Sequence, residues 1–103
     1  MNNKQETNKA LKALEQLGCM VFNMSSDRRM PPGMIGFPDH CIVSKHGEVI
    51  FIEDKFGKDK LSKEQVGVRG IIETCAMMNP KVFYYINTGN IQQIVDEIID
   101  RIK

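Results

Sequence analysis

The chain has 103 residues, of which 42% are hydrophobic and 26% charged, and its formal net charge is +1. This length suits one domain with a modest core and is too short for two, so we expect a single domain over residues 1–103. The composition excludes a disordered chain, and the small net charge excludes nucleic-acid binding through a globally basic surface. A polyanion would have to be held by a local cluster of basic side chains or by a metal ion.

The cysteines and the N-terminal segment indicate a cellular compartment. Cys19, Cys41 and Cys75 are odd in number, lack C-x-x-C spacing and lie within apolar stretches, a pattern typical of reduced, buried thiols. The first residues are polar and contain no signal-peptide core, and no apolar run approaches the roughly 18 residues of a membrane span. We therefore expect a cytoplasmic protein without membrane contact.

Residues 4–17 are predicted to form the first helix. Its apolar stripe is expected to contain Ala10, Ala13, Leu14 and Leu17, and Gly18 ends it. Glu6 precedes this stripe at helical spacing. Its side chain could point toward a site beyond the start of the helix. Alternatively, it could be a first-turn acid that interacts favourably with the helix dipole.

Residues 19–24 are predicted to form a short buried strand, and the polar, proline-containing segment 25–36 is predicted to be irregular. Arg28 and Arg29 lie in this segment. They could form an arm that contacts a phosphate backbone, or they could belong to an ordinary solvated loop.

The next stretch predicts a hairpin whose second strand ends in Glu53-Asp54-Lys55. Side chains alternate across a strand, so Glu53 and Lys55 share one face and Asp54 points to the other. A three-residue loop with Gly47 at positive φ would place Asp39 opposite Glu53, and the two carboxylates would then repel unless a cation lay between them. A two-residue turn would instead place Asp39 opposite Asp54, so the metal hypothesis depends on the register.

The remaining elements complete an α/β pattern. Ser62-x-x-Gln65 has the form of a capping box, and the helix that it starts runs to about Met78. Its inner face is predicted to contain Val68, Ile71, Ile72, Cys75 and Ala76, while Gly67 and Gly70 suggest a close approach by another backbone. Residues 81–87 are predicted to form a strand buried on both sides, and residues 91–102 an amphipathic helix. The predicted order is α-β-β-β-α-β-α, with helices on the faces of a mixed sheet.

Three motifs together resemble a known group of nucleases. Gly36-Phe37-Pro38-Asp39, Phe51-Ile52-Glu53-Asp54-Lys55 and Leu61-Ser62-x-x-Gln65 look like the PD-(D/E)xK superfamily, and more narrowly the small stand-alone VRR-NUC proteins of phages and bacteria. The resemblance covers nearly the whole chain. It implies a restriction-endonuclease-like core and a metal-dependent DNA endonuclease that needs no organic cofactor.

The resemblance also implies roles for individual residues. Asp39 and Glu53 would bind Mg²⁺ or Mn²⁺, and the main-chain carbonyl of Asp54 would complete the protein ligands. Glu6 would match the acid of the family's first helix and Gln65 its helix glutamine, although Gln65 could equally be a simple capping residue. Lys55 would contact the attacking water or the scissile phosphate. Its positive charge suits a transition state that gains negative charge.

Substrate and assembly follow from the same resemblance. Similar proteins act on branched DNA, including four-way (Holliday) junctions, and two symmetric cuts would require a homodimer. The candidates for DNA contact are Arg28, Arg29, Lys45, Lys58, Lys60 and Lys63. His40 and His46 have no partner at ligand spacing and are expected in turn or strand-surface roles. The alternatives are a catalytically inactive nucleic-acid-binding module of the same fold, a structural subunit of a larger complex, and a mere surface ion pair between Glu53 and Lys55.

Overall fold

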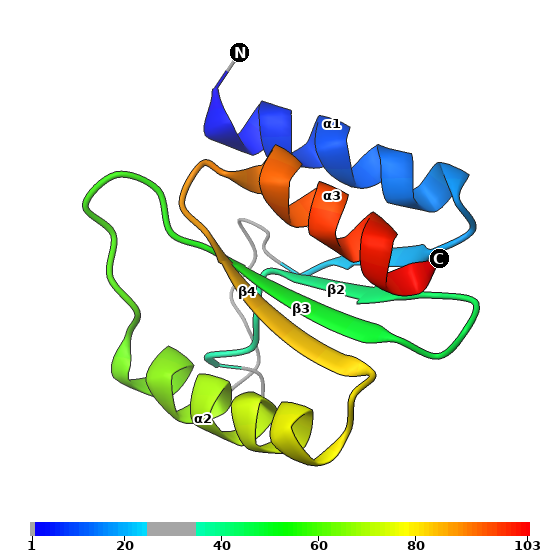
Figure 1. Cartoon of the computed structure of the whole chain (residues 1–103). Helices are drawn as coiled ribbons and strands as arrows, with labels where there is room; N and C mark the ends of the chain where they lie inside the picture. Colours follow the sequence, from blue (N-terminus) through cyan, green and yellow to red (C-terminus); the bar gives the residue numbers. More distant parts are fainter. Residues whose placement is uncertain (1, 25–34) are drawn as a thin grey trace.

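The computed structural model describes residues 2–24 and 35–103. Within these ranges the elements follow the predicted order and pack as an α/β fold with a mixed sheet of strand order β1-β2-β3-β4. Helices α1 and α3 cover one face of the sheet and α2 covers the other (Figure 1). The elements are α1 (Asn3–Gln16), β1 (Met20–Asn23), β2 (His40–Val43), β3 (Val49–Asp54), α2 (Lys63–Met78), β4 (Val82–Asn87) and α3 (Ile91–Ile102).

The β2–β3 hairpin has the register that places Asp39 opposite Glu53. His40 pairs with Ile52 and Val43 with Val49, and the main-chain N–H of Ser44 donates to the carbonyl of Glu48 at 3.0 Å. Residues 45–47 form the loop, in which Gly47 has a φ of +89°. This conformation favours glycine because a Cβ would meet the following carbonyl oxygen. The predicted three-residue loop is therefore confirmed.

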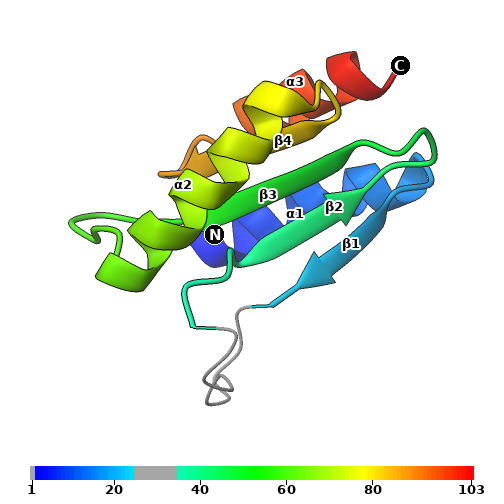
Figure 2. The same cartoon turned by 90° about the horizontal axis from the view of Figure 1, so that it is seen from below.

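The two outer strands are more exposed than their sequences predict. Among the described strands, β4 pairs with β3 alone, in parallel, and β1 pairs with β2 alone, so each forms an edge of the sheet (Figure 2). The prediction of a doubly buried strand at residues 81–87 was wrong, since Val82 to Ile86 are only partly buried. Residues 20–23 are likewise not a buried strand, because Met20 and Phe22 are largely exposed.

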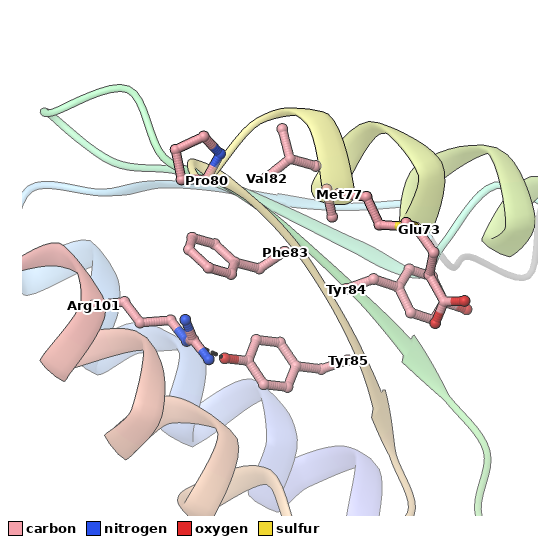
Figure 3. A pocket seen from close by; sticks show the side chains of 9 residues that line it. Glu73, Met77, Pro80, Val82, Phe83, Tyr84, Tyr85 and Arg101 are labelled. Carbon is pink, nitrogen blue, oxygen red and sulfur yellow. Dashed lines mark hydrogen bonds between the residues drawn. The ribbon is translucent and has the colours of Figure 1, made fainter.

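A hollow of about 320 Å³ lies beside the exposed edge of β4, between α2 and α3. The guanidinium of Arg101 lies over the ring of Phe83, with 4.5 Å to its centroid, and donates to the hydroxyl of Tyr85 at 2.9 Å (Figure 3). Aromatic rings thus line the hollow beside this edge of the sheet.

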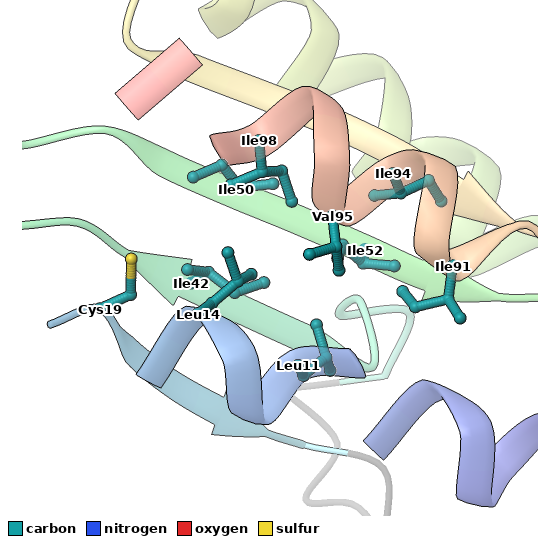
Figure 4. Packing of buried hydrophobic residues seen from close by; sticks show 10 residues of the cluster. All are labelled: Leu11, Leu14, Cys19, Ile42, Ile50, Ile52, Ile91, Ile94, Val95 and Ile98. Atoms are coloured by element: carbon teal, nitrogen blue, oxygen red, sulfur yellow. The ribbon is translucent and has the colours of Figure 1, made fainter. Parts of the chain in front are cut away.

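The main core lies between the sheet and the helices α1 and α3. Isoleucine side chains from β2, β3 and α3 interlock there with two leucines of α1 (Figure 4). The core residues are Leu11, Leu14, Cys19, Ile42, Ile50, Ile52, Ile91, Ile94, Val95 and Ile98. Of the three cysteines, all free, Cys19 is buried, Cys41 is intermediate and Cys75 is exposed, so the expectation of buried thiols holds for Cys19 alone.

The buried stripe of α1 differs from the predicted one. Thr7, Leu11 and Leu14 are buried, whereas Leu17 is 47% exposed. Moving the buried stripe by one residue corresponds to rotating the helix about its axis by about 100°. The rotation that buries Leu11 removes more apolar surface from water than a rotation that buries Ala10. The same rotation of the helix points Glu6 away from the sheet, where it is exposed.

Helix α2 begins as predicted but buries much less than expected. Its capping box, Ser62 with Gln65, is present, yet Ile72 is its one buried residue. Ile71 is 69% exposed and Cys75 is also exposed, so the predicted inner face was partly wrong. Gly67 and Gly70 face open space with respect to the described residues, and no backbone among these approaches them. Among the described helices, none is both long enough and apolar enough to cross a bilayer.

Candidate active site

The candidate site lies where β2 begins and β3 ends. Asp39 immediately precedes β2, and one of its carboxylate oxygens, Oδ2, accepts from the main-chain N–H of Asp54 at 2.7 Å. Glu53 lies on the face of β3 that α2 covers and is only 1% exposed. The hairpin register brings these two acids together from opposite strands.

The environment of Glu53 is unusual for a carboxylate. Its Oε1 accepts from the Gln65 side chain at 2.7 Å, and Lys55 Nζ lies 3.9 Å from the same oxygen. Its Oε2 is buried and has no hydrogen-bond partner among the residues that the structure describes. Burial, with the neighbouring Asp39 carboxyl adding to it, raises the pKa of Glu53 to about 8. A buried acid with one free oxygen is ready to accept either a proton or a cation.

Gln65 connects the start of α2 to this carboxylate. Its side-chain oxygen accepts from the main-chain N–H of Ser62 at 2.8 Å, while its amide nitrogen donates to Glu53. Gln65 therefore makes both the cap contact and a contact with Glu53, the two contacts that the sequence left as alternatives. They are compatible because a primary amide has one acceptor end and one donor end.

Asp54 points to the opposite face of the sheet, as strand alternation predicts. His40 Nε2 lies 2.6 Å from Asp54 Oδ2, and the side-chain amide of Asn87 donates to Asp54 Oδ1 at 3.0 Å. His40 is 2% exposed, so the expected turn or strand-surface role is wrong. The hairpin register could have indicated its burial, because His40 alternates with Ile42 and pairs with Ile52 on the core face.

Glu6 is the predicted ligand that the structure does not bring to Asp39 and Glu53. It is exposed and lines a different hollow, near Lys9 and Gln92. The helix α1 instead turns Lys4 and Asn8 toward a hollow of about 200 Å³ whose lining includes Asp39, His40 and Asp54. Residues two apart on a helix point in nearly opposite directions, so Lys4 and Glu6 cannot both face this hollow.

The predicted DNA-contacting lysines fall into two groups. Lys58, Lys60 and Lys63 are exposed on the segment that leads from Lys55 into α2, at the same end of the sheet as the carboxylates. Lys45 lies in the hairpin loop at the other end of β2 and β3. Arg28 and Arg29 lie outside the described residues.

The chemistry of this end of the sheet fits a hard divalent cation. In the described part of the chain, no group of three or more histidine, cysteine, aspartate or glutamate side chains could hold a metal ion. Two carboxylates and a main-chain carbonyl are nevertheless ligands that Mg²⁺ and Mn²⁺ accept, since these ions retain several waters. The free oxygen of Glu53 and the proximity of Asp39 are consistent with such an ion.

Comparison with known proteins identifies the class of fold. No family model matches the sequence, and no curated protein matches it. The element order and the mixed sheet are those of a restriction-endonuclease-like fold.

The particular likeness is to a solved structure described as "VRR_NUC domain". The similarity covers 97% of this chain and 97% of that chain, with a TM-score of 0.63 and 20% sequence identity. The chain therefore has a VRR-NUC-type fold, as the three sequence motifs indicate.

Proposed function

We propose that this protein is a metal-dependent endonuclease that hydrolyses phosphodiester bonds in DNA. The observation that carries the proposal is the buried Glu53, whose free oxygen and raised pKa sit beside Asp39 and Lys55. A nearly fully buried Glu53 beside the partly buried Asp39 would be costly for the fold alone, because Lys55 supplies one positive charge to two neighbouring carboxyl groups. The VRR-NUC-type fold supports the same assignment.

In this proposal Asp39, Glu53 and the main-chain carbonyl of Asp54 hold Mg²⁺ or Mn²⁺. Such an ion supplies a Lewis acid for the phosphodiester and a nucleophilic water at neutral pH. Gln65 fixes the orientation of Glu53 through Oε1, which leaves Oε2 free to act as a ligand. The main-chain N–H of Asp54 fixes one oxygen of Asp39 in the same way.

Lys55 has the role of stabilising charge. Its side chain is mostly buried and shares the face of Glu53, with Nζ 3.9 Å from Oε1. This distance is too long for a strong ion pair, so the ammonium group keeps hydrogen-bonding capacity for a phosphate oxygen. A compact positive charge at this position would stabilise the additional negative charge of the transition state.

The preferred substrate in this proposal is branched DNA, including four-way junctions, and the active form is a homodimer. Lys58, Lys60 and Lys63 would contact phosphates beside the site, which their exposure and position support. The Arg28-Arg29 segment would extend this contact. Two active sites related by a twofold axis would allow paired cuts in a symmetric junction.

The test is cleavage of labelled junction, flap and linear duplex DNA with Mg²⁺ or Mn²⁺. We expect Asp39→Asn, Glu53→Gln and Lys55→Ala each to lower the cleavage rate at least about 100-fold, since each removes a ligand or a stabilising charge. The matched control is Asp96→Asn, which neutralises an exposed acid on α3 and should leave the rate unchanged.

Three outcomes would contradict the proposal. Cleavage that survives Asp39→Asn and Lys55→Ala would come from a contaminant. Binding of DNA without cleavage would favour the inactive nucleic-acid-binding module. Equal cleavage of junction and linear duplex would remove the preference for branched DNA while leaving the nuclease assignment intact.

A further inference from the structure

A chain of polar side chains crosses the α1 face of the sheet, directly behind the candidate site. Asn23 Oδ1 lies 2.7 Å from His40 Nδ1, and His40 Nε2 lies 2.6 Å from Asp54 Oδ2. The side-chain amide of Asn87 donates both to Asp54 Oδ1 at 3.0 Å and to Thr7 Oγ1 at 2.9 Å. Each of the four strands and α1 contributes one residue to this chain.

Three of the five side chains in this network are buried, and each of these three is hydrogen-bonded. His40, Asn87 and Thr7 are all buried, and the side-chain oxygen of Asn87 accepts from the main-chain N–H of Gly89 at 3.0 Å. The Asp54 carboxylate only accepts, so Nε2 donates to it, and a neutral His40 ring then accepts at Nδ1 from the amide nitrogen of Asn23, whose side-chain oxygen and nitrogen are interchangeable in position. A satisfied buried network of this kind rigidifies the elements that it joins.

Two backbone contacts connect this network to the candidate site on the other face. Asp54 holds its side chain in the network while its own main-chain N–H donates to Asp39 Oδ2. The main-chain carbonyl of Asn87 accepts from the N–H of Lys55 at 2.8 Å. The end of β3 is thus fixed on both sides of Asp54, just where strand pairing ends.

We infer that Asp54, His40 and Asn87 are positioning residues that hold Asp39 and the end of β3 in the geometry the site requires. The Asp54 carboxylate fixes the end of β3 through its hydrogen bonds on the α1 face of the sheet, and it is not a third acid in the site. This inference rests on the proposed function only for the identity of the metal. The hydrogen bond that restrains Asp39 forms between residues of this chain and needs no metal ion.

The decisive comparison is Asp54→Asn against Asp54→Ala. Both keep the main-chain carbonyl and both remove the negative charge, but the asparagine can still accept from Asn87 and meet His40, which can change tautomer. The first measurement, made without metal, is hydrogen exchange of the residue 54 amide by NMR. We expect exchange at least about tenfold faster in Asp54→Ala and Asn87→Ala, and within about threefold of wild type in Asp54→Asn.

The second measurement is Mn²⁺ binding by calorimetry in the absence of DNA. Loss of an outer partner of a metal ligand commonly weakens binding about 10- to 100-fold, so Asp54→Ala and Asn87→Ala should fall in this range. Ile98→Val is the matched control, because it loosens the buried core without touching the network. It should change neither the residue 54 exchange rate nor the Mn²⁺ affinity.

The outcomes separate this inference from the proposed function. Equal exchange rates in all the variants would overturn the positioning role, even if the wild type binds Mn²⁺ and cuts DNA. Equal loss in Asp54→Asn and Asp54→Ala would also overturn it, because charge would then matter more than position. If the wild type binds no Mn²⁺, the proposed function fails, while the exchange rates still decide whether the network restrains Asp39.

Discussion

Burial of the Glu53 carboxyl destabilises the folded protein, and the proposed function requires the same carboxyl as a metal ligand. Its pKa rises from 4.5 to about 8 mainly because burial disfavours the charged form. Between these two pH values the folded chain keeps a proton that the unfolded chain has lost. The folded state binds more protons, so its stability must decrease as the pH rises through this window.

This linkage gives a prediction for the protein in EDTA. The melting temperature of the wild type should fall from about pH 5 to about pH 8 relative to that of Glu53→Gln, whose side chain does not ionise. The two curves should lie closest below a pH of 4.5, where the wild-type carboxyl is mostly protonated in both states. Scanning calorimetry across this range checks the prediction, and parallel curves would contradict it.

The same residue predicts how a metal ion should act on stability. A ligand that binds only the folded state raises its stability, so Mn²⁺ at about pH 8 should raise the melting temperature of the wild type. Glu53→Gln should show a much smaller rise, because an amide oxygen carries no charge. Asp96→Asn serves as the control and should respond as the wild type does. An equal rise in all three proteins would indicate binding elsewhere.

At the scale of elements, the chain contains two capping boxes of the same form with different surroundings. Asn2 with Gln5 caps α1, and Ser62 with Gln65 caps α2. Each glutamine accepts from the main-chain N–H of its cap residue. Gln65 also donates to Glu53, whereas Gln5 is exposed at the start of α1. The start of α2 is therefore coupled to the site, and the start of α1 provides a natural comparison.

We predict that Gln65→Ala and Gln5→Ala differ in function more than in stability. Each should lower the free energy of unfolding by roughly 0.5–2 kcal/mol, the usual range for loss of a helix cap. Gln65→Ala alone should weaken Mn²⁺ binding and slow DNA cleavage, because Glu53 Oε1 loses its amide donor. Chemical denaturation measures the first effect, and calorimetry with a cleavage assay the second. Equal behaviour of the two variants in metal binding would show that Gln65 is only a cap.

The whole molecule presents an apolar surface that its own described residues do not cover. Val66, Ile71, Met77 and Met78 of α2 are exposed, and the adjacent edge of β4 has no strand partner. Exposed apolar side chains and open strand edges favour association with another chain. We therefore predict that the proposed homodimer forms through this surface.

The prediction at this scale is a dimer in solution, measured by size-exclusion chromatography with light scattering. The double variant Ile71→Glu, Met78→Glu should be monomeric, because it places charges on the apolar surface of α2. Met20→Glu makes the same kind of change on β1, at the other edge of the sheet, and should leave the dimer intact. A monomeric wild type would argue against paired cleavage of junctions.

Much of this fold follows from local pattern. Helix periodicity predicts α3, the Ser62-x-x-Gln65 capping box predicts the start of α2, and Gly47 indicates the hairpin loop. Given that loop, strand alternation places Asp39 opposite Glu53 and turns Asp54 away. These features depend on neighbours close in the chain, whose geometry is fixed by steric limits and hydrogen bonding.

Other features were decided by contacts between distant parts of the chain. The rotation of α1, and with it the position of Glu6, depends on which side chains fill the core beneath Val95 and Ile98. A strand rich in apolar residues becomes an edge strand, as β4 does among the described strands, when the topology places it last in the sheet. The polar partners of the buried His40 ring, Asn23 and Asp54, come from the strands on either side of it, 17 and 14 residues away along the chain. Sequence by itself determined the elements and the side-chain alternation in the hairpin, while tertiary packing decided which faces are buried, because that choice sums many small long-range contacts.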